Sequence, residues 1–200
     1  MNSTQPAYFG EIVASSLTTW TVQCWQLDTY PAFGSLIFLE YDGKCSFGIV
    51  SSIQTHSKDS SRTPFAFGKT LQELKQEQPH IFQLLTSTLT CIPLSYSENN
   101  LIIHEIPKRP APIHTFAGAC STDLLKIFFE NSSWMIPFFN LAQQNPLFDE
   151  LLIALLRNGY EHRALSQESL QEIIDIFSLL THDDYRKLKI FLQRIEVFIH

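Results

Sequence analysis

The sequence predicts an α+β protein in which a small N-terminal β-barrel is followed by a C-terminal α-helical domain. Up to about residue 106, short runs with a two-residue period are separated by Gly, Pro, Ser and Asn, and later in the chain the apolar residues recur at helical spacing. A length of 200 residues with 44% hydrophobic content is enough to bury a core. We therefore expect the barrel at 8–106, a connector at 107–118 and the helical domain at 119–200.

The expected barrel strands are short. In "TTWTVQCW", Trp20, Val22 and Cys24 alternate with their neighbours, as side chains do on the two faces of a strand. Similar runs follow in "SLIFLEY", "CSFGIVSSI", "LTCIPLSY" and "LIIHEI", and the intervening "YDGK" and "SENN" are typical of turns. Five or six strands at this spacing are typical of a small barrel or sandwich.

Residues 68 to 70 read Gly-Lys-Thr, as in the end of a phosphate-binding loop. That loop needs a glycine five positions before Gly68, and the residue there is Thr63. Thr70 and Glu73 instead match a T-x-x-E capping box, in which each residue satisfies a backbone N–H of the other at the start of a helix. The tripeptide therefore predicts a helical segment near 70–87, inserted in the barrel, and we expect no nucleotide or other cofactor.

The segment "IPKRPAPIHTF" has three prolines in six residues, which excludes regular helix and disfavours a central strand. It is the expected connector. Beyond it, "NPLFDELLIALLRNGY" predicts a helix from near Pro146 to near Gly159, and Thr181 is the expected N-cap of the last helix. One face of that last helix carries its apolar residues, which are Leu188, Phe191, Leu192, Ile195 and Ile199.

Large aromatic residues crowd together at the start of the helical domain. They are Phe128, Phe129, Trp134, Phe138 and Phe139. One helical face cannot bury them all, so they are expected to pack between barrel and helices or to form an exposed surface for a partner protein. We favour the internal packing, and we take the five residues as the candidate partner interface.

The composition disfavours several other classes of function. With 20 acidic and 14 basic residues, the formal charge of −6 gives no general attraction to nucleic acid, and a basic cluster on the last helix reads as a solvated face. The four cysteines lack a C-x-x-C pair and the seven histidines lack a metal-binding pattern, so we expect reduced core thiols and no metal or catalytic site. The N-terminus lacks the pattern of a signal peptide and no apolar run reaches membrane-spanning length, which predicts a soluble, cytoplasmic protein.

The order of the motifs, with "LQELKQEQPHIFQLL" followed by "PKRPAPIHTF", resembles the HerA–ATP synthase (HAS) barrel family over about residues 8 to 118. The C-terminal part looks like that of stand-alone, uncharacterised barrel proteins of photosynthetic bacteria. The resemblance implies a six-stranded barrel and a proline-rich exit formed by Pro107, Pro110, Pro112 and His114, with the His114 ring bonded to the barrel backbone. In the larger relatives the barrel orients an ATPase domain within a ring, but the segment after the connector here is too short for such a domain.

These expectations lead to a functional prediction of a non-enzymatic interaction or assembly module. Its partner would be another protein, with a ring-shaped ATPase or an ATP synthase-like complex as the class implied by the resemblance; self-association stays open. The alternative is an accessory subunit of a DNA-processing or other ring-shaped ATPase, which would need a basic groove in the folded chain. An enzyme would need a pocket that gathers Cys, His and carboxylate groups from distant parts of the chain.

Overall fold

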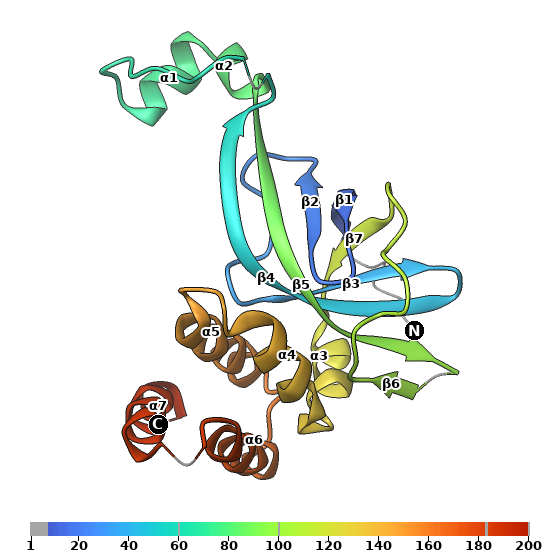
Figure 1. The fold of residues 1–200 in the computed structure, drawn as a ribbon. Helices are drawn as coiled ribbons and strands as arrows, with labels where there is room; N and C mark the ends of the chain where they lie inside the picture. Colours follow the sequence, from blue (N-terminus) through green and yellow to red (C-terminus); the bar gives the residue numbers. More distant parts are fainter. Residues whose placement is uncertain (1–7, 60, 100, 183, 200) are drawn as a thin grey trace.

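The computed structural model describes residues 8–59, 61–99, 101–182 and 184–199 (Figure 1). The strands are β1 (Tyr8–Ser15), β2 (Trp20–Cys24), β3 (Leu36–Tyr41), β4 (Lys44–Ser57), β5 (Leu85–Glu98), β6 (Leu101–Ile103) and β7 (Phe116–Ala119). The helices are α1 (Leu71–Glu77), α2 (His80–Gln83), α3 (Thr122–Phe129), α4 (Met135–Ala142), α5 (Phe148–Glu161), α6 (Gln167–Leu180) and α7 (Tyr185–Ile199), with a 3₁₀ turn at Ser132–Trp134.

Six antiparallel strands close into a barrel. The hydrogen-bonded order is β2-β1-β7-β3-β4-β5, and β2 also pairs with β5, which joins the two ends of the sheet. The short β6 pairs with β5 outside this ring. The predicted α+β class, with an N-terminal six-stranded barrel followed by helices, is confirmed.

The last strand of the barrel differs from the one expected. The run "LIIHEI" forms only β6, outside the ring, while β7 at Phe116–Ala119 pairs with both β1 and β3 and completes it. The barrel thus extends to residue 119, and the proline-rich segment is a link within it rather than a connector to the helices. Sequence periodicity missed β7 because the strand is built of small residues: a Cβ at Gly118 would lie 2.3 Å from the ring of Phe38.

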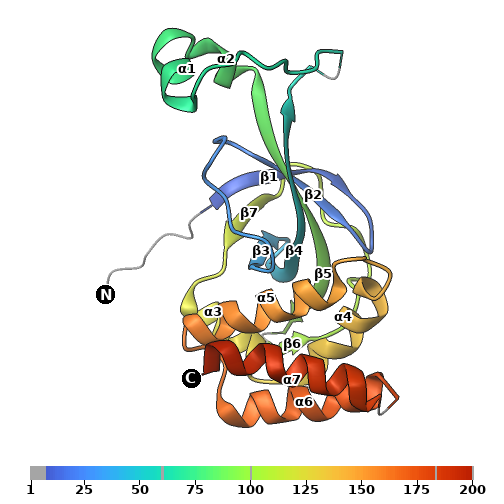
Figure 2. The ribbon, with the colours of Figure 1, turned by 90° about the vertical axis from the view of Figure 1, so that its left-hand side faces the viewer.

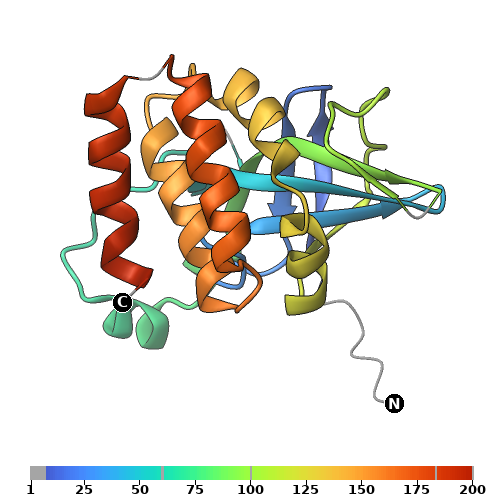
Figure 3. The same cartoon turned by 90° about the horizontal axis from the view of Figure 1, so that it is seen from below.

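The barrel wall separates two apolar cores. On β3, Ile37 and Leu39 belong to a cluster that fills the barrel, whereas Leu36 and Phe38 belong to a second cluster shared with the helices. Since alternate side chains of a strand point to opposite faces, β3 is buried on both sides. Helices α3, α4 and α5 lie next to the barrel, with α6 and α7 beyond them (Figures 1, 2 and 3).

The helix ends differ in two places from those expected. Thr181 closes α6, where its hydroxyl donates to the carbonyl of Phe177, and α7 is instead capped by Asp184, whose carboxylate accepts from two backbone N–H groups of its first turn. Helix α5 continues through Gly159, where a Cβ would lie 2.7 Å from the Phe129 ring, so this glycine serves close packing rather than helix termination. The apolar stripe of α7 is confirmed at Phe191 and Ile195, which are both buried.

Strands β4 and β5 are longer than the barrel requires. Their pairing continues to Ser57 opposite Leu85, whereas β2 accompanies β5 only from Thr88 to Cys91. The outer part is thus a two-stranded arm that projects from the barrel and carries α1 and α2 at its end, away from the other helices (Figures 1 and 2). We call residues 58–84 the arm tip.

Candidate interaction surface at the arm tip

Helix α1 begins with the capping box that the sequence predicts. The backbone N–H of Thr70 donates to Glu73 Oε2 at 2.7 Å, and the N–H of Glu73 donates to Thr70 Oγ1 at 3.3 Å. These hydrogen bonds lower the pKa of the Glu73 carboxyl, because they stabilise its charged form. The inserted helical segment near 70–87 is therefore present, as α1 and α2.

The Gly-Lys-Thr tripeptide is the entry to this helix. Gly68 has a φ of +66°, which only glycine adopts readily, and turns the chain toward Thr70. Lys69 Nζ forms an ion pair with Glu77 at the other end of α1. The lysine is thus engaged within the arm tip, and the geometry is that of a helix start.

No described residue of the arm tip is buried. Phe65 is 71% exposed, Leu71 60% and Leu84 50%. The ring centroids of Phe65 and Phe67 lie 4.4 Å apart, so the exposed Phe65 packs against a second aromatic ring. Exposed apolar groups that gather in one place, rather than being scattered singly, are typical of interaction sites.

The tip also has an open hollow of about 320 Å³ on its surface. It lies between the loop that precedes α1 and the segment that contains α2. The apolar part of its lining comes from Pro64, Phe65, Phe67, Ile81, Leu84 and Leu85. A partner's apolar side chain could enter this hollow while Phe65 and Leu84 contact the surface around it.

The charge of the tip differs from that of the whole chain. Residues 58–84 hold four basic and three acidic groups, in a protein with 14 and 20. Arg62 pairs with Asp59 at 3.2 Å and Lys69 with Glu77. Lys75 lies over the Phe82 ring at 5.9 Å and, like Lys58, contacts no carboxylate of the described residues. The tip is thus mildly cationic, with two lysines available to a partner.

The aromatic cluster proposed from the sequence lies in the protein interior. Four of its members, Phe128, Phe129, Trp134 and Phe138, are buried, while Phe139 is half-buried. The Phe128 ring packs 5.6 Å from Trp134 and 6.0 Å from Phe47 of the barrel wall. The cluster fills the space between barrel and helices, which is the packing that we favoured, and its buried members present little surface to a partner.

The proline-rich segment lies along the barrel. Pro107 is buried, while Pro110, Pro112 and His114 are exposed. The backbone N–H of His114 donates to the carbonyl of Ile12 at 2.8 Å. The expectation for its ring is wrong, because Nδ1 lies 3.2 Å from Glu11 Oε2 rather than on the barrel backbone. The exposed ring lies near a carboxylate that the sequence spacing does not reveal.

The thiols are unsuited to nucleophilic chemistry. All four are free, and burial raises the pKa of Cys24 to about 11 and of Cys45 to about 12. The same cause raises the pKa of Cys91 and Cys120. Thiolates are the reactive form, so none of these thiols is activated at neutral pH. Within the described ranges, no group of three or more potential metal ligands comes together.

No protein-family model and no curated protein matches this chain. The resemblance to the HAS-barrel family thus stays a prediction. Among the described residues, no helix is long and apolar enough to cross a bilayer.

From the sequence we took the group around Phe128 as the candidate partner interface, although we favoured internal packing for it. The exposed Phe65 and the half-buried Phe67 stand in "RTPFAFGKT" among polar residues, Pro and Gly, with no apolar period on either side. Two phenylalanines in a segment without helical or strand periodicity were the sequence feature that could have indicated this site.

Proposed function

We propose that this protein is a non-enzymatic interaction or assembly module whose arm tip docks on another protein. The observation that carries the proposal is the arm itself, a projecting hairpin that holds Phe65, Leu71 and Leu84 in solvent. These residues contribute nothing to either core of the chain. A partner that covers them would supply the burial that the chain does not.

The energy available from such docking is substantial. Full burial of a Phe or Leu side chain contributes about 1.5–3 kcal/mol, so covering three of them offsets part of the entropy lost on association. Aromatic side chains that enter a partner's pocket are frequent hot spots of protein interfaces. The paired rings of Phe65 and Phe67 fit that role.

The arm tip is ordered before it meets a partner. The capping box at Thr70 and the ion pair between Lys69 and Glu77 hold α1 without help from the barrel. Order in the free state reduces the conformational entropy that binding would otherwise cost. The arrangement therefore favours docking of a preformed tip over folding on the partner.

The charges indicate the kind of surface that the tip would meet. Lys58 and Lys75 also belong to the tip and lack carboxylate partners among the described residues. We therefore infer a partner with an apolar groove edged by acidic side chains. A ring-shaped ATPase or an ATP synthase-like complex is the partner class that the HAS-barrel resemblance implies.

The alternative of a DNA-associated accessory subunit has less support at this site. A nucleic-acid surface needs several free cations along a groove. At the tip, Arg62 and Lys69 are each paired with a carboxylate. Loss of a partner on nuclease treatment would nevertheless move this alternative to first place.

The proposal is tested by pull-down from the native cell extract at low and high salt, after nuclease treatment. The double variant Phe65→Ser/Leu84→Ser removes the apolar contacts of the tip, and Leu179→Ser, at a site 70% exposed on α6, is the matched control. We expect a protein that binds wild type and the control equally and the double variant at least tenfold less. Equal recovery with all three would contradict docking through the tip. Sedimentation of the purified protein measures its oligomeric state and so distinguishes self-association from binding to a different protein.

A further inference from the structure

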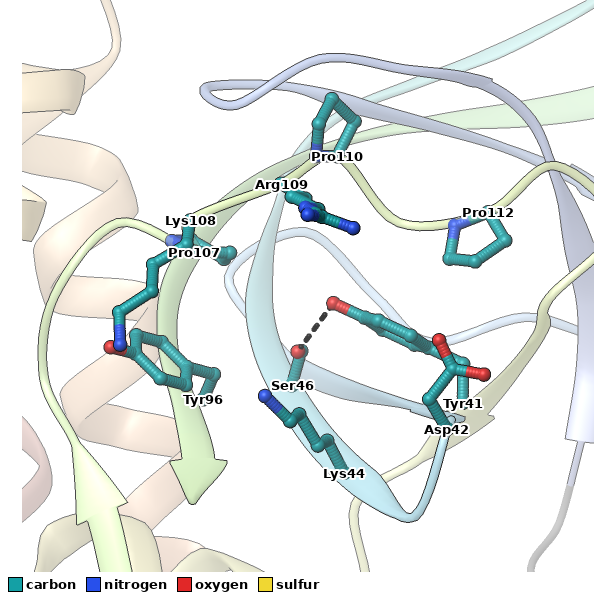
Figure 4. A pocket seen from close by; sticks show the side chains of 10 residues that line it. All are labelled: Tyr41, Asp42, Lys44, Ser46, Tyr96, Pro107, Lys108, Arg109, Pro110 and Pro112. Carbon is teal, nitrogen blue, oxygen red and sulfur yellow. Dashed lines mark hydrogen bonds between the residues drawn. The ribbon is translucent and has the colours of Figure 1, made fainter.

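A second hollow lies at the other end of the β4–β5 hairpin from the arm tip. It has a volume of about 400 Å³, within the range of small-ligand pockets. The proline-rich segment crosses it on one side and the β3–β4 turn borders it on the other (Figure 4). It is lined by Tyr41, Asp42, Lys44, Ser46, Tyr96, Pro107, Lys108, Arg109, Pro110 and Pro112. We call it the proline pocket.

Strand geometry fixes the aromatic part of the proline pocket. Asp42 and Gly43 have φ values of +52° and +69°, as in the tight turns that join adjacent antiparallel strands, and they place Tyr41 opposite Lys44. The Tyr41 hydroxyl lies 3.1 Å from Ser46 Oγ, and Ser46 pairs with the buried Tyr96 on β5. These flat rings and the prolines therefore form walls suited to a flat apolar group.

The cations of the proline pocket differ in whether they have an ion-pair partner. Lys44 and Lys108 share one carboxylate, that of Glu98, with both Nζ atoms 3.4 Å from its oxygens. Arg109 contacts no carboxylate of the described residues. Figure 4 shows its guanidinium on the side of the proline-rich segment, across from Asp42 on the turn. One cation is thus available at one side of the pocket, and the opposite side carries both Asp42 and Lys44.

We propose that the proline pocket binds a small organic monocarboxylate with a flat apolar part. The guanidinium of Arg109 offers a planar fork of N–H donors that matches a carboxylate. The apolar part would lie against Tyr41 and the prolines.

Sodium benzoate is the probe, because it combines one carboxylate with one flat ring. Titration into the ¹⁵N-labelled full-length protein is followed by amide chemical shifts at low salt. We expect saturable shifts at Tyr41–Ser46 and at Lys108, Arg109 and Ala111, with a dissociation constant in roughly the millimolar range for so small a ligand. Benzamide, which has the same shape without the charge, should bind at least fivefold more weakly.

The role of Arg109 is tested with a matched pair of variants. Arg109→Gln should weaken benzoate binding at least fivefold, while Arg186→Gln, which removes the same charge from exposed α7, should leave it unchanged. The amide spectrum of each variant also reports whether the fold is retained.

Two results would overturn this proposal. Absence of saturable shifts at the pocket residues would show that the pocket does not bind benzoate. Equal binding of benzoate and benzamide would show that charge plays no part in the binding. Neither result bears on the arm tip, because these measurements involve no protein partner.

Discussion

The inner and outer halves of strand β4 lie in different environments. Near the barrel, Phe47 and Ile49 of β4 pack against the helices and Val50 packs inside the barrel, all of them buried. Beyond the barrel, Gln54, Thr55 and His56 of the same strand are exposed. Backbone pairing runs through both halves, with register shifts near Gly48 and Ser52 in the inner half, so hydrogen bonding alone does not separate them.

The difference lies in what holds each half in place. The inner half is fixed by two cores that share its wall, so its side chains are specified by packing on both faces. The outer half is held by the pairing of β4 with β5 and by the buried Ser87, whose hydroxyl donates to the carbonyl of Leu27 at 2.6 Å. The arm tip is held by local interactions, chiefly the capping box and short-range ion pairs. Packing makes the inner half a scaffold, whereas no described residue of the arm tip is buried.

The largest effect should come from an aromatic residue between barrel and helices. Phe128→Ala removes a fully buried ring that touches Phe47, Phe129 and Trp134, and should lower the free energy of unfolding by about 3–5 kcal/mol. Phe65→Ala, the same change at the exposed tip, should stay within about 0.5 kcal/mol. Urea denaturation measures the free energy of unfolding of both variants. Equal decreases would show that the two regions do not differ in their contribution to stability.

A smaller loss is expected from overpacking of the barrel wall. A methyl group at Gly118 would lie 2.3 Å from the Phe38 ring, which is buried between wall and helices. Gly118→Ala should therefore cost about 1–3 kcal/mol by the same denaturation measurement. A stability equal to that of wild type would mean that the wall is looser than the contact implies.

Removing the cap of α1 should act only on the arm tip. Thr70→Ala deletes the side chain that accepts from Glu73 N–H, and the opening free energy of α1 should fall by about 1 kcal/mol. Hydrogen exchange of the Leu74 and Gln78 amides, which donate to carbonyls of this helix, reports that opening. Thr63→Ala, an exposed tip position, is the control. A matching fall in protection of barrel amides would show that the tip and barrel open together.

Removing the whole arm tip should have only a small effect on the stability of the barrel. Replacement of residues 58–84 by Asn-Gly joins Ser57 to Leu85, which already pair across the hairpin, through a two-residue turn. Because no described residue of the tip is buried, the free energy of unfolding should change by less than about 1 kcal/mol. A variant that fails to fold would show that the tip is needed by the scaffold.

Local features were predictable from the sequence, and long-range ones were not. The capping box at Thr70 and the apolar stripe of α7 depend on residues a few positions apart, so pattern alone identifies them. Strand β7 escaped prediction because Ala117 and Gly118 carry almost no apolar signal and owe their place to the distant Phe38. The turn before α7 was misjudged because Thr181 and Asp184 are both capping residue types, and tertiary context decides which one caps.

The contrast between Phe65 and Phe128 shows the same limit for the functional site. Both phenylalanines stand near other aromatic residues, and the sequence directed attention to the denser group around Phe128. Burial depends on whether another part of the chain returns to cover a residue. The barrel wall covers Phe128, and no described segment of this chain covers Phe65.

The most direct test of docking through the arm tip is site-specific photo-crosslinking in the native cell. Phe65→p-benzoylphenylalanine places the reactive group at the tip, and Leu179→p-benzoylphenylalanine places it at an equally exposed site on α6. The account predicts an irradiation-dependent adduct with one other protein from position 65 and none from position 179. The same adducts from both positions, or an adduct only with a second copy of this chain, would contradict it.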